Sequence, residues 1–335
     1  AFCGFLYKSQ PFLDHSNPDL SATALYEIPY LDGVFCEKQV TDVHPNLSRG
    51  TVSGTASFQI ENITGTEQMV AFAINPGYEV NSVQANGQPV PFEIDNYQES
   101  NMALLNVTIP DLESIDLCFD YQGFPQDWNL METMQGKPEI SSKYLCLENQ
   151  TLAPMIMNVG TADGLFSSIT DITLPDTMTV IPFGLAEAKK EVEHDNGTIT
   201  WRIEDTGTGG ILYAGDYVRQ DIDAAGTSIQ FYYGRKHHPI MEEANAAEAI
   251  QTVMEYCSSH YGVPSFSSLD SLKLIQGRVA GGGYAVSGAS LMDEQDFTAQ
   301  NLHNSEKGGI PGEVMIHELV HQWWGLGAMF DVSQP

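Results

Sequence analysis

The spacing of apolar residues changes near residue 235, and this change constrains the fold more than any other feature of the sequence. Between about residue 50 and residue 235, apolar and polar residues alternate in short runs separated by Gly and Pro. A period of two fits half-buried β-strands, whereas on a helix it would spread apolar side chains over every face. After Gly234 the apolar positions recur at helical spacing. We therefore predict two domains, residues 1–235 and residues 236–335.

The first domain is predicted to be mainly β. Residues 51–60 alternate most clearly, and Asn86-Gly87 lies between two short apolar runs, where it can supply the positive φ angles of a hairpin turn. Short strands at this spacing predict an antiparallel sandwich or a saddle-shaped sheet. Further strands are predicted at 67–74, 102–109, 178–182, 198–203 and 228–233.

The second domain is predicted to mix helices and strands. Residues 239–261 have apolar side chains at helical spacing, and 271–276 have the pattern of a strand. A second helix is expected to begin near Pro311, because proline suits a first helical position, and to continue through Trp323.

The charge balance excludes one class of partner. Lys and Arg total 14 and Asp and Glu total 44, so the formal net charge is 14 − 44 = −30. A phosphate backbone would be repelled by such a chain, so we predict no nucleic-acid binding. The same charge disfavours docking on anionic lipid, and it is compatible with solubility alone or with cationic partners.

Other features bear on location. Five Asn-x-Ser/Thr sequons, more than chance supplies, favour an extracytoplasmic or cell-surface protein, although the sequence also leaves the cytoplasm open. No apolar run is long enough to span a bilayer. The chain begins at Ala1 and ends at Pro335, shortly after its strongest motif, so we expect a fragment of a longer protein that is anchored in a membrane by other segments. The sequence gives no oligomeric state.

The motif with the clearest chemistry is His317-Glu318-Leu319-Val320-His321. Two histidines four residues apart on a helix lie one turn from each other on one face, so both imidazoles can bind one metal ion. Glu318 is rotated by about 100° from His317, so it is predicted to act as a general base on a water at the metal rather than as a ligand. Zinc is the expected ion.

The residues around this motif resemble a known family. Residues 312–325 (GEVMIHELVHQWWG) resemble the zinc-helix signature of the membrane alanyl aminopeptidases, and the His-Gln-Trp-Trp-Gly part is far more distinctive than HExxH alone. Residues 50–54 (GTVSG) and 83–87 (VQANG) are similar to parts of that family's N-terminal domain. The resemblance implies an N-terminal β-saddle domain followed by the start of a thermolysin-like zinc peptidase domain.

The resemblance also implies a set of roles. His317 and His321 would bind zinc, Glu318 would activate water, and the substrate would be a peptide. The family's third ligand is a Glu about eighteen residues after the second His, which here falls beyond Pro335, as does the catalytic Tyr. Because catalytic zinc normally has three protein ligands, we predict that this chain alone binds zinc weakly or not at all and is inactive.

The predicted substrate-binding residues depart from the family pattern. Aminopeptidases of this family carry Gly-x-Met-Glu-Asn, whose Glu holds the substrate's free amine, whereas this chain has Ala285 at that position. Gly283, Tyr284 and Ala285 are nevertheless expected on an edge strand whose backbone pairs with an extended peptide, and the alternative is an ordinary buried strand. Glu148 is a second candidate for amine capture, against the alternative of a surface glutamate.

Two functions therefore remain open. The first is a zinc-dependent peptidase of the aminopeptidase-like class. The second is a non-catalytic scaffold or binding domain of a membrane protein such as a transporter permease, which the missing carboxylate at Ala285 motivates. A ligand Glu and a downstream Tyr in the parent chain would favour the enzyme.

Overall fold

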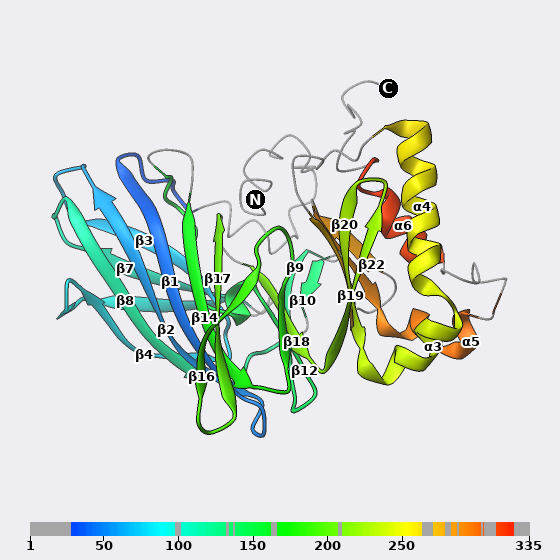
Figure 1. Cartoon of the computed structure of the whole chain (residues 1–335). Helices are drawn as coiled ribbons and strands as arrows, with labels where there is room; N and C mark the ends of the chain where they lie inside the picture. Colours follow the sequence, from blue (N-terminus) through cyan, green and yellow to red (C-terminus); the bar gives the residue numbers. More distant parts are fainter. Residues whose placement is uncertain are drawn as a thin grey trace. The chain divides into compact units, whose positions relative to one another are not determined.

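The chain folds into two compact units (Figure 1). The computed structural model describes residues 28–97, 102–131, 134–136, 138–161, 166–206, 210–262, 271–278, 283–286, 288–302, 304 and 313–324. The first unit contains the described residues up to 182 together with 187–214, and the second contains 183–186 and the residues from 215 onward. The first is built from strands and the second combines a sheet with helices, which confirms the predicted fold class.

An eight-stranded sheet dominates the first unit. Its strands are antiparallel to their neighbours except that β1 and β14 run parallel. Side chains of β2 alternate between buried and exposed positions, as the period of two in the sequence predicts. In spatial order the strands are β16 (Ala188–His194), β17 (Thr198–Thr206), β14 (Ser167–Pro175), β1 (Val34–Asn46), β2 (Thr51–Asn62), β8 (Ser114–Gly123), β4 (Tyr78–Ala85) and β5 (Gln88–Pro89).

A second sheet packs against part of the first and closes the core of this unit. Its members in order are β13 (Met155–Ile156), β3 (Gln68–Ile74), β7 (Met102–Ile109) and β6 (Phe92–Tyr97). Phe72 of β3 meets Phe58 of β2 and Phe119 of β8, with ring centroids 4.9 and 4.7 Å apart. All three rings are buried, so this aromatic cluster joins the two sheets.

Two smaller sheets complete the first unit. The four-stranded sheet contains, in order, β11 (Glu139–Ile140), β12 (Tyr144–Glu148), β18 (Ile211–Gly215) and β15 (Thr179–Pro182). The other is the pair β9 (Trp128–Met131) and β10 (Met134–Gly136).

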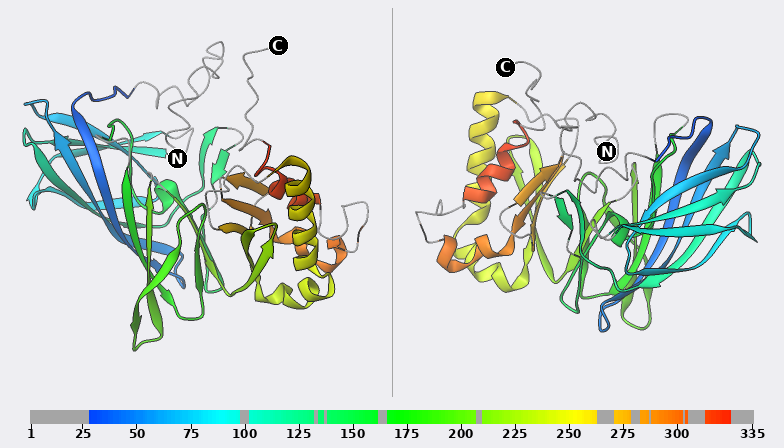
Figure 2. Two further views of the ribbon diagram at one scale, coloured as in Figure 1. Left: turned by 45° about the horizontal axis from the view of Figure 1, so that its top comes forward. Right: turned by 180° about the vertical axis from the view of Figure 1, so that it is seen from behind.

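The second unit has a five-stranded sheet with helices on one face (Figure 2). The strands are, in order, β19 (Tyr217–Ala224), β20 (Thr227–Gly234), β21 (Ser271–Gly277), β23 (Ala289–Asp293) and β22 (Gly283–Val286). The helices are α3 (His238–Glu243), α4 (Ala246–Tyr261), α5 (Ala299–Leu302) and α6 (Glu313–Val320). Apolar residues of the sheet and of the three helices α3, α4 and α6 form one core, which includes Phe231, Met254, Met292 and Leu319.

The unit boundary lies earlier than the residue at which the sequence pattern changes. We predicted the second domain from residue 236, whereas the second compact unit contains residues 183–186 and the chain from Gly215 onward. The reason is hydrogen bonding: β19 pairs with β20, and β20 pairs in parallel with β21, so this hairpin belongs to the sheet of the second unit. The helix predicted over 239–261 is also interrupted, because Asn245 has a left-handed conformation with φ of 50°.

Candidate metal centre

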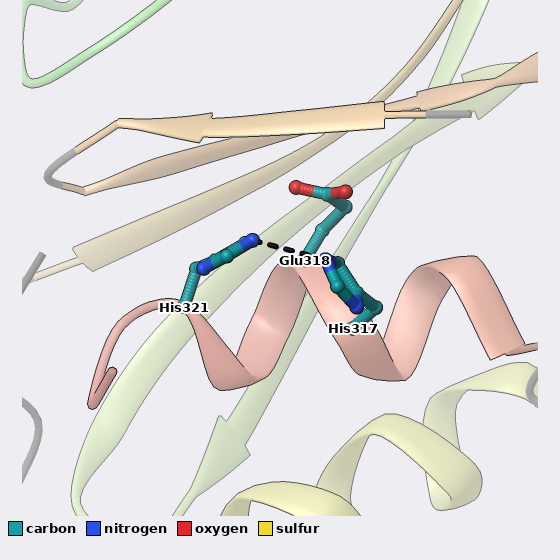
Figure 3. Close-up of side chains that lie close together, drawn as sticks. All are labelled: His317, Glu318 and His321. Atoms are coloured by element: carbon teal, nitrogen blue, oxygen red, sulfur yellow. Dashed lines mark hydrogen bonds between the residues drawn. The ribbon is translucent and has the colours of Figure 1, made fainter. Parts of the chain in front are cut away.

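Helix α6 presents two different faces. Met315, Leu319 and the following Trp323 are buried in the core of the second unit. His317 is exposed on another face, and His321 follows one turn later (Figure 3). The helix therefore forms because its apolar stripe is covered by the core, and this leaves both imidazoles on a side that a ligand can reach. Pro311, where we predicted the start of this helix, lies outside the described residues.

The two imidazole rings converge. The Nε2 atoms of His317 and His321 are 3.1 Å apart, and the ring planes are nearly perpendicular at 87°. Two nitrogen atoms that each lie about 2.0–2.1 Å from one tetrahedral zinc ion are separated by about 3.3–3.4 Å. The observed separation is close to this value, so the pair fits a shared metal ion.

The backbone fixes the orientation of one of these rings. Nδ1 of His321 donates a hydrogen bond to the carbonyl oxygen of Trp324 at 3.1 Å. A carbonyl oxygen can only accept, so the proton is on Nδ1. The lone pair of the neutral ring is then on Nε2, where it can accept the hydrogen bond from Nε2–H of His317 or bind a metal ion. Metal-binding histidines are commonly held in this way through the nitrogen that does not bind the metal.

Glu318 completes the group and is oriented differently from the histidines. Its side chain is 4% exposed, and its Oε2 atom has no hydrogen-bond partner among the described residues. Burial raises the pKa of this carboxyl, and the nearby His321 and His317 partly oppose that increase. One ligand atom from each of His317, Glu318 and His321 lies within 4.8 Å of the others. Imidazole nitrogens and carboxylate oxygens are ligand types that divalent metal ions take, so the residue types present fit such an ion.

Strand β22 lies next to this group. Gly283, Tyr284 and Ala285 all belong to β22, which pairs with β23 and forms the edge of the sheet among the described strands. A Cβ atom built on Gly283 would lie 2.8 Å from Cγ of Glu318, so the strand backbone contacts the side chain of the predicted base. Among the predicted substrate-binding residues, Gly283 thus has a backbone contact with the side chain of Glu318.

Glu148 lies in the first unit, at the end of β12. It is half-buried, and burial raises the pKa of its carboxyl to about 7, while a hydrogen bond from Sγ of Cys146 to its Oε1, at 3.6 Å, lowers it. Glu148 therefore differs from an ordinary surface glutamate. Its role in amine capture stays a prediction.

Two residues beside the site were not predicted from the sequence. Gln322 is fully buried and hydrogen-bonds to the backbone of the turn between β22 and β23. Ser290 of β23 is also fully buried, and its hydroxyl donates to the carbonyl oxygen of Glu318 at 3.0 Å. The position of Gln322, a polar residue inside the apolar stretch after His321, is the one signal that could have identified it.

The fold is similar to that of solved M1 zinc metallopeptidases. A mutant of such an enzyme from Deinococcus radiodurans, with bound Tyr-Ser-Ala substrate, matches 88% of this chain at 15% identity and a TM-score of 0.56. A mutant two-domain M1 zinc metallopeptidase with bound L-arginine matches 89% at 14% identity and a TM-score of 0.55.

The chain spans 65% and 66% of the lengths of those two structures, slightly less than two thirds. No protein-family model and no curated protein matches the sequence. At identities of 14–15% a structural likeness establishes the fold alone. The chain therefore has the fold of M1 zinc metallopeptidases over most of its described length.

Proposed function

We propose that this chain belongs to a zinc-dependent peptidase of the aminopeptidase-like class and carries part of its metal site. The observation that supports this most strongly is the 3.1 Å separation of the two Nε2 atoms beside the buried carboxylate of Glu318, whose Oε2 atom has no hydrogen-bond partner among the described residues. The fold shared with M1 zinc metallopeptidases is a second, independent support.

His317 and His321 are the residues that would hold zinc. When bound, zinc polarises water and the scissile carbonyl and so supplies Lewis-acid chemistry. Glu318 would accept a proton from the attacking water and then donate it to the leaving amine. The raised pKa of Glu318 suits the first step, because a more basic carboxylate accepts a proton from water more readily.

We expect the 335-residue chain alone to bind zinc weakly. Two imidazoles are one fewer than the three protein ligands that catalytic zinc normally takes. Isothermal titration of this chain with zinc is expected to show weak binding or none, and tight stoichiometric binding would refute this expectation.

The proposed substrate is a peptide that lies along β22. One protein with this fold was solved with Tyr-Ser-Ala bound. An edge strand can pair with an extended peptide through its backbone. Ala285 has no carboxylate for a free amine, so we expect acetylation of the peptide's N-terminus to change its hydrolysis little. Strong loss of hydrolysis on acetylation would indicate instead that another group, such as Glu148, holds the amine.

Hydrolysis of a peptide by the parent protein tests the proposal. Glu318→Ala is expected to abolish zinc-dependent hydrolysis, and Glu255→Ala, which removes an exposed carboxylate of α4, is expected to leave it unchanged. An unchanged rate in Glu318→Ala would end the peptidase proposal.

The second proposal is a peptidase-like scaffold that binds peptides without cleaving them. The absence of a carboxylate at Ala285 favours it. A parent protein that binds a peptide in the presence of zinc, and whose peptide remains intact on long incubation, would support the scaffold over the enzyme.

We also propose that the protein lies outside the cytoplasm and that other segments of the parent protein attach it to a membrane. No helix in the described ranges combines the length and apolar character needed to cross a membrane. The sequons support secretion less than their number suggests, because Asn62 is 2% exposed and its amide donates to the carbonyl oxygens of Thr66 and Pro110. Asn46 and Asn196 are exposed, so glycan attachment at these two residues is the test of secretion.

A further inference from the structure

We propose that the β22–β23 hairpin positions Glu318, and that Gln322 and Ser290 are the positioning residues that hold this hairpin on the metal helix. The inference rests on the proposed function, since it assigns a role around the proposed base.

The hairpin contacts both the side chain and the main chain of residue 318. The strand backbone at Gly283 is so close to Glu318 that a Cβ there would lie 2.8 Å from Cγ and 3.0 Å from Cδ. On the main-chain side, the hydroxyl of Ser290 donates to the carbonyl oxygen of Glu318 at 3.0 Å. A Cβ at position 283 would also overlap with the carbonyl oxygen of Leu291 on β23, so glycine lets the strand approach both its partner strand and the side chain of Glu318.

Gln322 holds the turn of the same hairpin. Its Oε1 accepts a hydrogen bond from the backbone N–H of Gly288 at 3.3 Å, and its Nε2 donates to the carbonyl oxygen of Val286 at 3.2 Å. Nε2 is also 3.4 Å from the hydroxyl oxygen of Ser290, which connects the two positioning residues. Both side chains are fully buried, so these bonds form where water cannot replace them.

These contacts differ from those that hold the helix in the core. Met315 and Leu319 pack α6 against the apolar core of the unit, and Trp323 bonds to the end of α4. The hydrogen bonds to the hairpin lie on another side of the helix, and they are made by the main chain of Glu318 and the side chain of Gln322. Their consequence is that the carboxylate and the edge strand keep one relative position, which a peptide on β22 would require.

Carbon-13 NMR of the 335-residue chain, labelled at the Glu carboxyl carbon, tests whether the hairpin positions Glu318. The Glu318 signal is identified by its loss in Glu318→Gln. We expect Gln322→Met and Ser290→Ala each to shift or broaden this signal, and Ser290→Thr, which keeps the hydroxyl, to restore it. The control is Ser258→Ala, since the Ser258 hydroxyl is buried on α4 with no hydrogen-bond partner among the described residues. An unmoved Glu318 signal in the folded Gln322→Met and Ser290→Ala variants would overturn the inference.

Kinetics of the parent protein give a second readout. Gln322→Met and Ser290→Ala are expected to lower kcat by about tenfold or more while the zinc Kd stays within about threefold, because the ligands themselves are not moved. Equal losses in kcat and zinc affinity would show that the hydrogen bonds of Gln322 and Ser290 hold the two histidines instead of Glu318. If the wild-type parent does not hydrolyse peptides, the proposed function fails, and the NMR result still decides the inference.

Discussion

Nδ1 of His321 donates a hydrogen bond to the carbonyl oxygen of Trp324 at 3.1 Å, three residues further along the chain. This bond places the proton of the neutral ring on Nδ1, so the lone pair is on Nε2. Nε2 faces the corresponding atom of His317 at 3.1 Å. The end of α6 therefore selects the histidine tautomer that can bind a metal ion.

Trp323 ties the same end of α6 to α4, and we predict that this bond stabilises the second unit. Its indole N–H donates to the carbonyl oxygen of Gly262 at 2.8 Å. Trp323→Phe keeps an aromatic ring and leaves this acceptor unpaired, so the free energy of unfolding should fall by about 1–3 kcal/mol in urea denaturation.

Trp201 provides a matched control in the first unit. It is 8% exposed against 7% for Trp323, and its buried indole N–H has no hydrogen-bond partner among the described residues. Trp201→Phe loses no such bond, so it should lower the free energy of unfolding clearly less than Trp323→Phe does. Equal costs for the two substitutions would contradict a specific role for the bond to Gly262.

The aromatic cluster of the first unit is predicted to carry much of its stability. Phe72 is fully buried between Phe58 and Phe119. Phe72→Ala leaves a cavity between the two sheets and should lower the free energy of unfolding by about 3–5 kcal/mol. Phe124→Ala, at a side chain that is 61% exposed, should cost less than about 1 kcal/mol. Similar costs for both would show that the sheets do not pack through this cluster.

Glu148 is predicted to make stability depend on pH. Burial raises the pKa of its carboxyl from an ordinary value of 4.5 to about 7. The folded state therefore holds this proton more tightly than the unfolded state, and its contribution to stability is lost as pH rises from about 4.5 through about 7. Glu148→Gln cannot ionise, so it should gain stability relative to wild type between pH 5 and pH 7.5.

Denaturant titrations of both proteins at these two pH values measure the effect. Glu255→Gln, at an exposed glutamate, is the control and should show no such gain. If the free energies of unfolding of Glu148→Gln and wild type differ by the same amount at both pH values, the buried environment of Glu148 is contradicted.

Local features of the fold could be predicted well from the sequence. The predicted strand 102–109 has the same bounds as β7. The predicted Asn86-Gly87 turn joins β4 to β5, with φ angles of 49° and 76°. Both follow from alternation and from left-handed turn residues, which depend on neighbours in the sequence.

Features that depend on distant contacts could not be predicted. Nothing in the local pattern of β19 and β20 indicates that they join the sheet of the second unit through β21. Lys273 is another example: it lies in the middle of β21 with 2% exposure, and its ammonium donates to the carbonyl oxygens of Gly184 and Ala186. A buried lysine with backbone partners 87 and 89 residues away leaves no pattern in the sequence.

In the candidate site, too, local features could be predicted from the sequence and contacts between distant residues could not. His317, Glu318 and His321 could be identified because the spacing of a metal-binding helix is local. The contacts of Gln322 with Val286 and Gly288 could not, because they join positions 36 and 34 residues apart and use the backbone of the turn. Their formation depends on the hairpin lying against α6, which no periodicity encodes.

Nitrogen-15 NMR of histidine-labelled protein, titrated with zinc, tests the central claim most directly, and it also detects weak binding. We predict that the Nε2 signals of His317 and His321 shift together along one binding curve while Nδ1 of His321 stays protonated, and that His317→Ala removes both shifts. Independent shifts of the two signals, or a proton on Nε2 of His321 throughout the titration, would contradict a shared metal site.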